Sequence, residues 1–115
     1  MDMQKIETLI KKFSQERNWD KFHNPKNLAM ALSVESSELL EIFQWLSQDE
    51  ALRLKDQKLE HLKEEIADVA VYLLRICMSY NINLEEAIVS KMKKNELKYP
   101  LKDKEGKCID YSKKF

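Results

Sequence analysis

Apolar side chains recur every three or four residues through most of this 115-residue chain, and this periodicity restricts its fold more than any other feature. Such spacing places side chains on one face of an α-helix, whereas a half-buried strand would need strict alternation. One glycine and two prolines leave few breaks between the periodic segments. The pattern therefore predicts an all-α protein built as a four-helix bundle.

Four main helices are expected, at about residues 3–17, 26–46, 59–79 and 84–97. The charged segment 47–58 links the second to the third and could hold a short helix of its own. Asn83 is expected to cap the fourth helix, which ends before Tyr99-Pro100. We therefore expect one helical domain over residues 1–100 and a polar C-terminal tail over residues 101–115.

Charge and hydropathy exclude two classes of function. Lysine and arginine together number 20, as do aspartate and glutamate, so the chain lacks the basic surplus of a nucleic-acid polymer binder. No apolar run approaches the roughly 20 residues of a membrane span, and the first residues have no signal-peptide pattern. We therefore expect a cytoplasmic protein whose cysteines, Cys77 and Cys108, are reduced and bind no zinc.

The third expected helix is apolar on more than one side. One row along it contains Leu59, Leu62, Ile66, Val69, Leu73 and Ile76. Val71 and Leu74 lie off this row. A helix that is apolar on two faces usually has neighbours on both, so we expect a homodimer or homotetramer.

The second expected helix carries an acid inside its own apolar face. Successive residues turn a helix by about 100°, which places Glu35 beside Leu39 and Glu38 at the edge of the same face. An isolated carboxylate is costly to bury unless it is paired, protonated or bound to a metal. On the third helix Glu65 and Asp68 repeat the spacing and share a face with Tyr72.

If these two helices pack side by side, the four carboxylates converge and repel one another unless a cation lies among them. Oxygen ligands suit Mg²⁺, with Mn²⁺ as a possible substitute. A di-iron bundle would instead carry Glu-x-x-His motifs, which this chain lacks. Lys91 and Asn95 project into the apolar face of the fourth helix, where a lysine could reach water, pair with an acid or meet a phosphate.

Each signal alone is weak, because acid pairs at this spacing usually lie on solvated helix faces. The combination, however, resembles the all-α nucleotide pyrophosphohydrolases of the MazG-like type, and most of all their dCTP pyrophosphatase branch. The family's metal motif corresponds to Glu35-Ser-Ser-Glu38 and Glu65-Ile-Ala-Asp68. The segments ERNWDKFHNPKNLAMAL, ELLEIFQW, EEIADVAVYLL and KMKKNELKYP also resemble that branch. The resemblance spans roughly residues 5 to 100.

This resemblance implies a site and a reaction. The four acids would hold Mg²⁺, and Lys91 and Asn95 would contact the triphosphate. The residues that would surround the nucleotide are Trp19, Phe22, His23, Trp45 and Tyr72. The sequence departs from the branch at Ile10, where the branch can carry a histidine, and at Lys98, where the family has an arginine. These departures concern the base preference.

The implied reaction is hydrolysis of a nucleoside triphosphate, dCTP or a modified dCTP, to the monophosphate and pyrophosphate. Glu38 is the expected proton acceptor, and Lys91 would stabilise charge on the phosphates. Two alternatives stay open at this point. One is a sibling enzyme acting on dUTP or another nucleotide, and the other is a non-catalytic helical module that dimerises.

Overall fold

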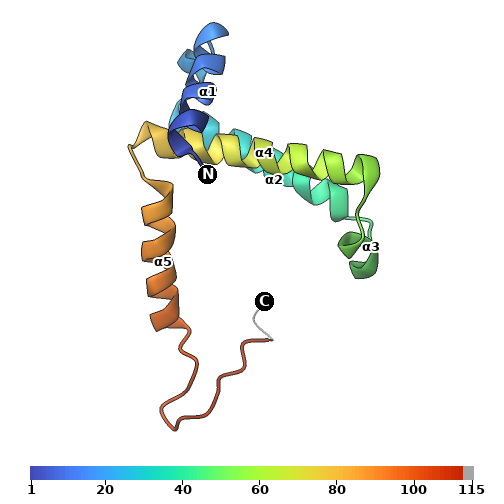
Figure 1. Cartoon of the computed structure of the whole chain (residues 1–115), viewed down its shortest axis with the longest axis vertical. Helices are drawn as coiled ribbons and strands as arrows, with labels where there is room; N and C mark the ends of the chain where they lie inside the picture. Colours follow the sequence, from blue (N-terminus) through green and yellow to red (C-terminus); the bar gives the residue numbers. More distant parts are fainter. Residues whose placement is uncertain (113–115) are drawn as a thin grey trace. The chain divides into compact units, whose positions relative to one another are not determined.

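The computed structural model describes residues 1–112 and confirms the all-α prediction (Figure 1). The helices are α1 (Met3–Glu16), the short 3-10 helix η1 (Asp20–Phe22), α2 (Pro25–Phe43), α3 (Gln48–Leu52), α4 (Asp56–Ser79) and α5 (Leu84–Lys98). Within the described residues, β pairing is limited to one isolated bridge between Lys102 and Cys108. The chain divides into two compact units, Met1–Ile82 and a second that begins at Asn83, and each is described by itself.

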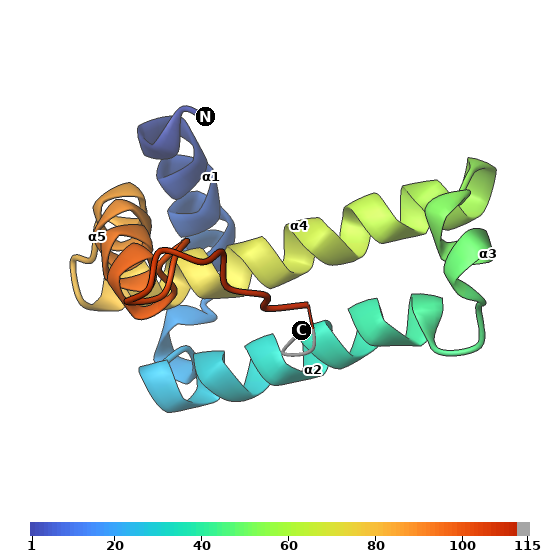
Figure 2. The ribbon, with the colours of Figure 1, turned by 90° about the horizontal axis from the view of Figure 1, so that it is seen from below.

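In the first unit α2 and α4 lie side by side and run in opposite directions (Figure 2). The segment that connects them contains α3, the short helix that the sequence allowed. A capping box starts this helix, since Ser47 Oγ accepts from Glu50 N–H at 3.1 Å and Glu50 Oε1 accepts from Ser47 N–H at 3.0 Å. Because α3 begins here, α2 ends at Phe43, three residues before the predicted end.

Helix α1 packs on the C-terminal half of α4. It ends in a Schellman motif: Asn18 adopts a left-handed backbone conformation, with φ of 54°, and Trp19 N–H donates to the Ser14 carbonyl at 3.0 Å. Asparagine tolerates this conformation better than most residues. Asn24 then caps α2 by accepting from Asn27 N–H at 2.9 Å. The segment between α1 and α2 is thus fixed at both ends.

Few side chains are fully buried in the single chain. Within residues 1–112 the buried apolar residues are Ile10, Leu28, Leu74 and Cys77. The predicted apolar row of α4 is only partly covered, since Leu59, Ile66 and Leu73 are exposed by 36%, 51% and 38%. The most buried face of α4 instead contains Leu74 and Cys77. Both cysteines are free thiols, as expected.

The second unit contains α5 and the residues that follow it. Asn83 caps α5, as predicted, by accepting from Glu86 N–H at 3.0 Å. Beyond the helix, Tyr111 donates from its hydroxyl to the Pro100 carbonyl at 2.9 Å. The division into a domain and a tail at residue 100 stays a prediction. None of the helices in residues 1–112 has the length and hydropathy needed to cross a membrane.

Leu28 is the most deeply buried large side chain, with 1% of its surface exposed. We expect Leu28→Ala to lower the free energy of unfolding by about 2–5 kcal/mol, because it removes packed methyl groups and leaves a cavity. The volume-conserving Leu28→Met should cost less than about 1.5 kcal/mol. Urea unfolding followed by circular dichroism measures both. Equal losses in the two variants would contradict this account of the core.

Candidate active site

Three of the four predicted carboxylates converge between α2 and α4. Each of Glu35, Glu38 and Glu65 offers an oxygen, and these oxygens all lie within 4.8 Å of one another. The first two come from adjacent turns of α2, and the third comes from α4, which passes beside them. Asp68 follows one turn later on α4, and its charge acts on Glu35. The antiparallel packing of the two helices therefore assembles the predicted acid cluster.

The cluster leaves carboxylate oxygens without partners. Glu35 Oε2 and Glu65 Oε2 are buried and accept no hydrogen bond from the described residues. The Glu65 side chain is 10% exposed, and its other oxygen lies 3.3 Å from His61 Nε2. A buried carboxylate oxygen without a donor is unfavourable unless a proton or a cation compensates it.

Electrostatics point to the same need for positive charge. The pKa of Glu35 is raised from 4.5 to about 7, first by burial, then by the hydrogen bond and charge of Glu38, and then by the charges of Asp68 and Glu65. A divalent cation beside these oxygens would reverse this effect by stabilising the ionised form. Clustered carboxylates, two with unpaired buried oxygens, form a donor set that fits a hard cation such as Mg²⁺ or Mn²⁺.

A cavity of about 380 Å³ lies beside the acids in the first unit. Its lining residues are Leu9, Ile10, Phe13, Ser14, Trp19, His23, Glu35, Asp68, Val71, Tyr72 and Arg75. Four of its rings meet edge to face in a row, with centroids 5.4 Å apart for Phe13 and Trp19, 5.9 Å for Trp19 and His23, and 6.3 Å for His23 and Tyr72. Burial, and then the charge of Arg75, lower the pKa of His23, so this ring is neutral at pH 7. The cavity thus offers aromatic surface next to a cation site.

The sequence did not point to Ser14 and Arg75, two polar residues that line this cavity. Arg75 donates from its guanidinium to Ser14 Oγ on α1 and to Asp20 Oδ1, the latter at 3.2 Å. A signal was present, because Arg75 follows Asp68 by seven residues and Tyr72 by three, which places all three on one side of α4. Its partners could not be read from the sequence, since they lie 61 and 55 residues away.

The remaining predicted residues do not line the cavity. Phe22 is 58% exposed and Trp45 is 86% exposed, the latter just beyond the end of α2. Lys91 and Asn95 lie on α5, in the second unit, where Asn95 Nδ2 is 3.8 Å from Met92 Sδ. Contacts of these four residues with a nucleotide stay predictions.

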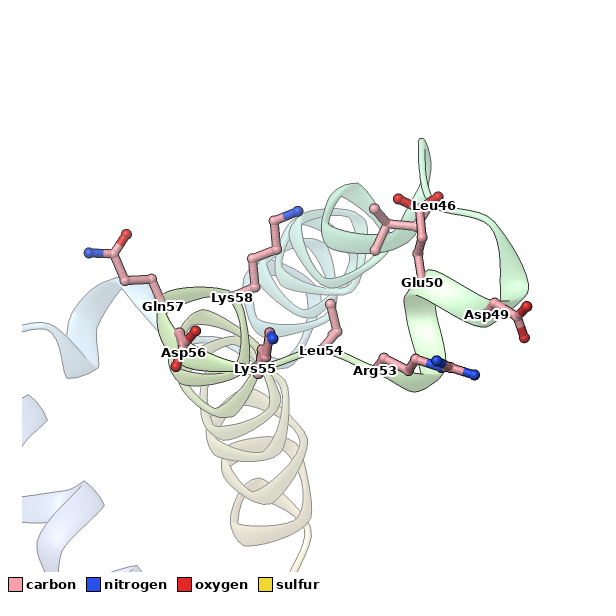
Figure 3. Close-up of a pocket in the computed structure, with 9 residues that line it drawn as sticks. All are labelled: Leu46, Asp49, Glu50, Arg53, Leu54, Lys55, Asp56, Gln57 and Lys58. Carbon is pink, nitrogen blue, oxygen red and sulfur yellow. The ribbon is translucent and has the colours of Figure 1, made fainter.

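A larger cavity, of about 810 Å³, lies at the opposite end of the α2–α4 pair, around α3 (Figure 3). Among its lining residues are Leu46, Arg53 and Leu54, together with acidic and basic side chains at its rim. Size alone does not make a site, and this cavity lacks the converging carboxylates of the smaller one. We therefore place the chemistry in the 380 Å³ cavity.

Comparison with known proteins assigns the chain to a family. The model of the MazG-like family matches residues 30–113, which include all four predicted acids. The chain therefore belongs to the MazG-like family. It is also similar to a solved pyrophosphatase from Archaeoglobus fulgidus, with 46% identity and a TM-score of 0.81 over 87% of this chain and 94% of that one.

Curated relatives are similar along most of the chain. The dCTP pyrophosphatase 1 of Rattus norvegicus is 37% identical over 112 residues, which cover 96% of this chain and 66% of the relative. The dCTP pyrophosphatase 1 of Homo sapiens is 36% identical over 100 residues, which cover 85% of this chain and 59% of the relative. The chain thus spans no more than about two thirds of the length of these relatives.

The raised pKa of Glu35 predicts a pH dependence of stability without metal. Its carboxyl has a pKa of about 7 in the folded protein, against 4.5 ordinarily, so between these values the folded chain keeps a proton that the unfolded chain releases. The free energy of unfolding should therefore fall as pH rises through this window, by about 3 kcal/mol from this group. Thermal melts in EDTA between pH 4.5 and 8 measure it.

Glu35→Gln is the matched control, since it keeps the shape and removes the titration. Its melting temperature should decline less over the same window, and Mg²⁺ should reduce the decline in the wild type alone. Parallel curves for the two proteins in EDTA would contradict the shift.

Proposed function

We propose that this chain is a Mg²⁺-dependent nucleoside triphosphate pyrophosphohydrolase. It would hydrolyse the bond between the α and β phosphates of a deoxynucleoside triphosphate, dCTP or a modified dCTP, and release the monophosphate and pyrophosphate. Its role would be to remove unwanted triphosphates in the cytoplasm. The observation that carries the proposal is the convergence of Glu35, Glu38 and Glu65 beside an aromatic cavity. The similarity to pyrophosphatases supports the reaction class.

Different residues of the chain would have different roles in the reaction. Glu35, Glu38, Glu65 and Asp68 would hold the cation, which when bound supplies Lewis-acid stabilisation to phosphate oxygens and acidifies water. Glu38 would accept the proton of the attacking water. Lys91 and Asn95 would contact the phosphates, where the lysine stabilises developing negative charge.

The aromatic row would hold the base. Flat rings such as Trp19 and Tyr72 provide stacking surface for a nucleobase, and both line the cavity. His23 is neutral, and its Nδ1 atom is buried and has no hydrogen-bond partner among the described residues. This atom is therefore available for a polar contact with the base. Phe22 and Trp45 would complete the enclosure.

Two other functions compete with this one. A sibling pyrophosphohydrolase with the same cation site but a different substrate, such as dUTP, predicts the same metal dependence and another base preference. A non-catalytic helical module predicts no pyrophosphate release and no stabilisation by Mg²⁺. Pyrophosphate release from a panel of triphosphates, with Mg²⁺ and with EDTA, separates the three.

Removing single charges from the cluster tests the cation site. We expect Glu38→Gln and Asp68→Asn each to lower pyrophosphate release at least about 100-fold, because each removes a cation ligand or the proton acceptor. Both should melt at or above the wild-type temperature in EDTA, since each relieves repulsion among the acids. Glu64→Gln, at an exposed position of α4, is the control and should keep wild-type turnover. Wild-type activity in either cluster variant would refute the site.

We also propose that the protein is a homo-oligomer, either a dimer or a tetramer. Among residues 1–112 only four apolar side chains are buried in the single chain, whereas Ile66, Leu73 and many others are exposed. Sedimentation velocity should therefore give a mass at least twice 13.7 kDa. Ile66→Asp should shift the protein towards the monomer, because a charge would enter an apolar interface. An unchanged wild-type monomer would contradict this proposal.

A further inference from the structure

Arg75 lines the cavity and carries a permanent positive charge, and the acid cluster does not use it. Its side chain is only 10% exposed, which is uncommon for an arginine. One terminal nitrogen donates to Ser14 Oγ and the other to Asp20 Oδ1 at 3.2 Å. The third nitrogen, Nε, is buried and has no hydrogen-bond partner among the described residues. A buried guanidinium N–H without an acceptor is costly, so a ligand that accepts a hydrogen bond from this atom would be stabilised there.

The position of Arg75 along α4 suggests which part of a ligand it meets. Asp68, Tyr72 and Arg75 all line the cavity, at steps of four and three residues on the same helix. Seven residues separate the first from the last, a rise of about 10 Å along the helix axis. That rise is comparable to the span of a nucleotide from its α-phosphate to its base. With the phosphates at Asp68 and the nucleotide lying along α4, the base would come beside Arg75.

We propose that Arg75 determines base specificity by donating a hydrogen bond from Nε to a carbonyl oxygen of the base, and that Ser14 and Asp20 position it. This inference rests on the proposed function and adds to it the group that reads the base. Arginine has only donors, so it selects an acceptor edge. Cytosine, uracil and guanine carry a carbonyl oxygen, whereas adenine offers only ring nitrogens as acceptors. The site should therefore disfavour dATP.

The two anchors explain why the arginine is fixed. Ser14 belongs to α1, and Asp20 belongs to η1, within the segment that also carries Trp19 and His23. Holding both terminal nitrogens leaves Nε as the remaining donor, in a set orientation rather than a mobile one. An ion pair with Asp20, which is 53% exposed, keeps the guanidinium charge compensated while the cavity is empty of substrate. Specificity from a positioned donor is large because the wrong base leaves that donor unpaired.

The test compares kcat/KM for dCTP, dUTP, dGTP and dATP in the wild type, Arg75→Lys and Arg75→Gln. We expect both variants to lose about 10- to 100-fold on the preferred carbonyl-bearing substrate, the range of a hydrogen bond to a charged donor, and less than about threefold on dATP. The loss should fall mainly on KM, because a ground-state contact is removed. Ratios between substrates on one variant do not depend on how much of it is folded.

Arg53→Gln, in the larger cavity, is the matched control and should keep the wild-type ratios. Equal losses on all four triphosphates would overturn the inference, since Arg75 would then serve only to tie α4 to α1. A wild type that prefers dATP would overturn it as well. If the wild type released pyrophosphate from none of the triphosphates, the proposed function itself would be refuted.

Discussion

Electrostatic repulsion among carboxylates on two packed helices is the constraint on which the rest of this structure depends. Antiparallel packing of α2 and α4 forces Glu35, Glu38 and Glu65 together, and hydrophobic burial elsewhere on the same helices sustains that arrangement. Without a cation, the raised pKa of Glu35 keeps its carboxyl protonated below about pH 7. Without a cation, the contact between α2 and α4 is therefore less stable than it would be with apolar side chains in place of the acids. This is typical of functional sites, where local stability is sacrificed for chemistry.

Local features of the fold followed from the sequence. Helical spacing predicted α1, α2, α4 and α5, because each forms through contacts between neighbours in the chain. The acid cluster was also predictable, since two pairs at i, i+3 on neighbouring helices must meet if the helices pack side by side. What periodicity could not decide was which apolar face of α4 turns inward. Both faces carry suitable residues, and the structure covers Leu74 and Cys77 more fully than Ile66 or Leu73.

Contacts distant in sequence account for most of what was missed. Arg75 lies on the same side of α4 as Asp68 and Tyr72, yet its role depends on Ser14 and Asp20, which are 61 and 55 residues away in the chain. Trp45 illustrates the opposite case. That Trp45 contacts the nucleotide stays a prediction, because its side chain is exposed in the single chain and nothing in the first unit encloses it. A residue's type and spacing therefore indicate a candidate, but its surroundings come from tertiary packing.

One helix arranges the proposed site from end to end. Along α4, the acids Glu65 and Asp68 come first, the ring of Tyr72 follows, and Arg75 comes last. This order matches the chemistry of a nucleotide, in which charged phosphates, a sugar and a flat polar base succeed one another. A helix is suited to this task because its rise fixes the spacing of the three functions and its packing against α1 and α2 holds them still. Base preference can then change through Arg75 and its anchors while the acids, and hence the reaction, stay the same.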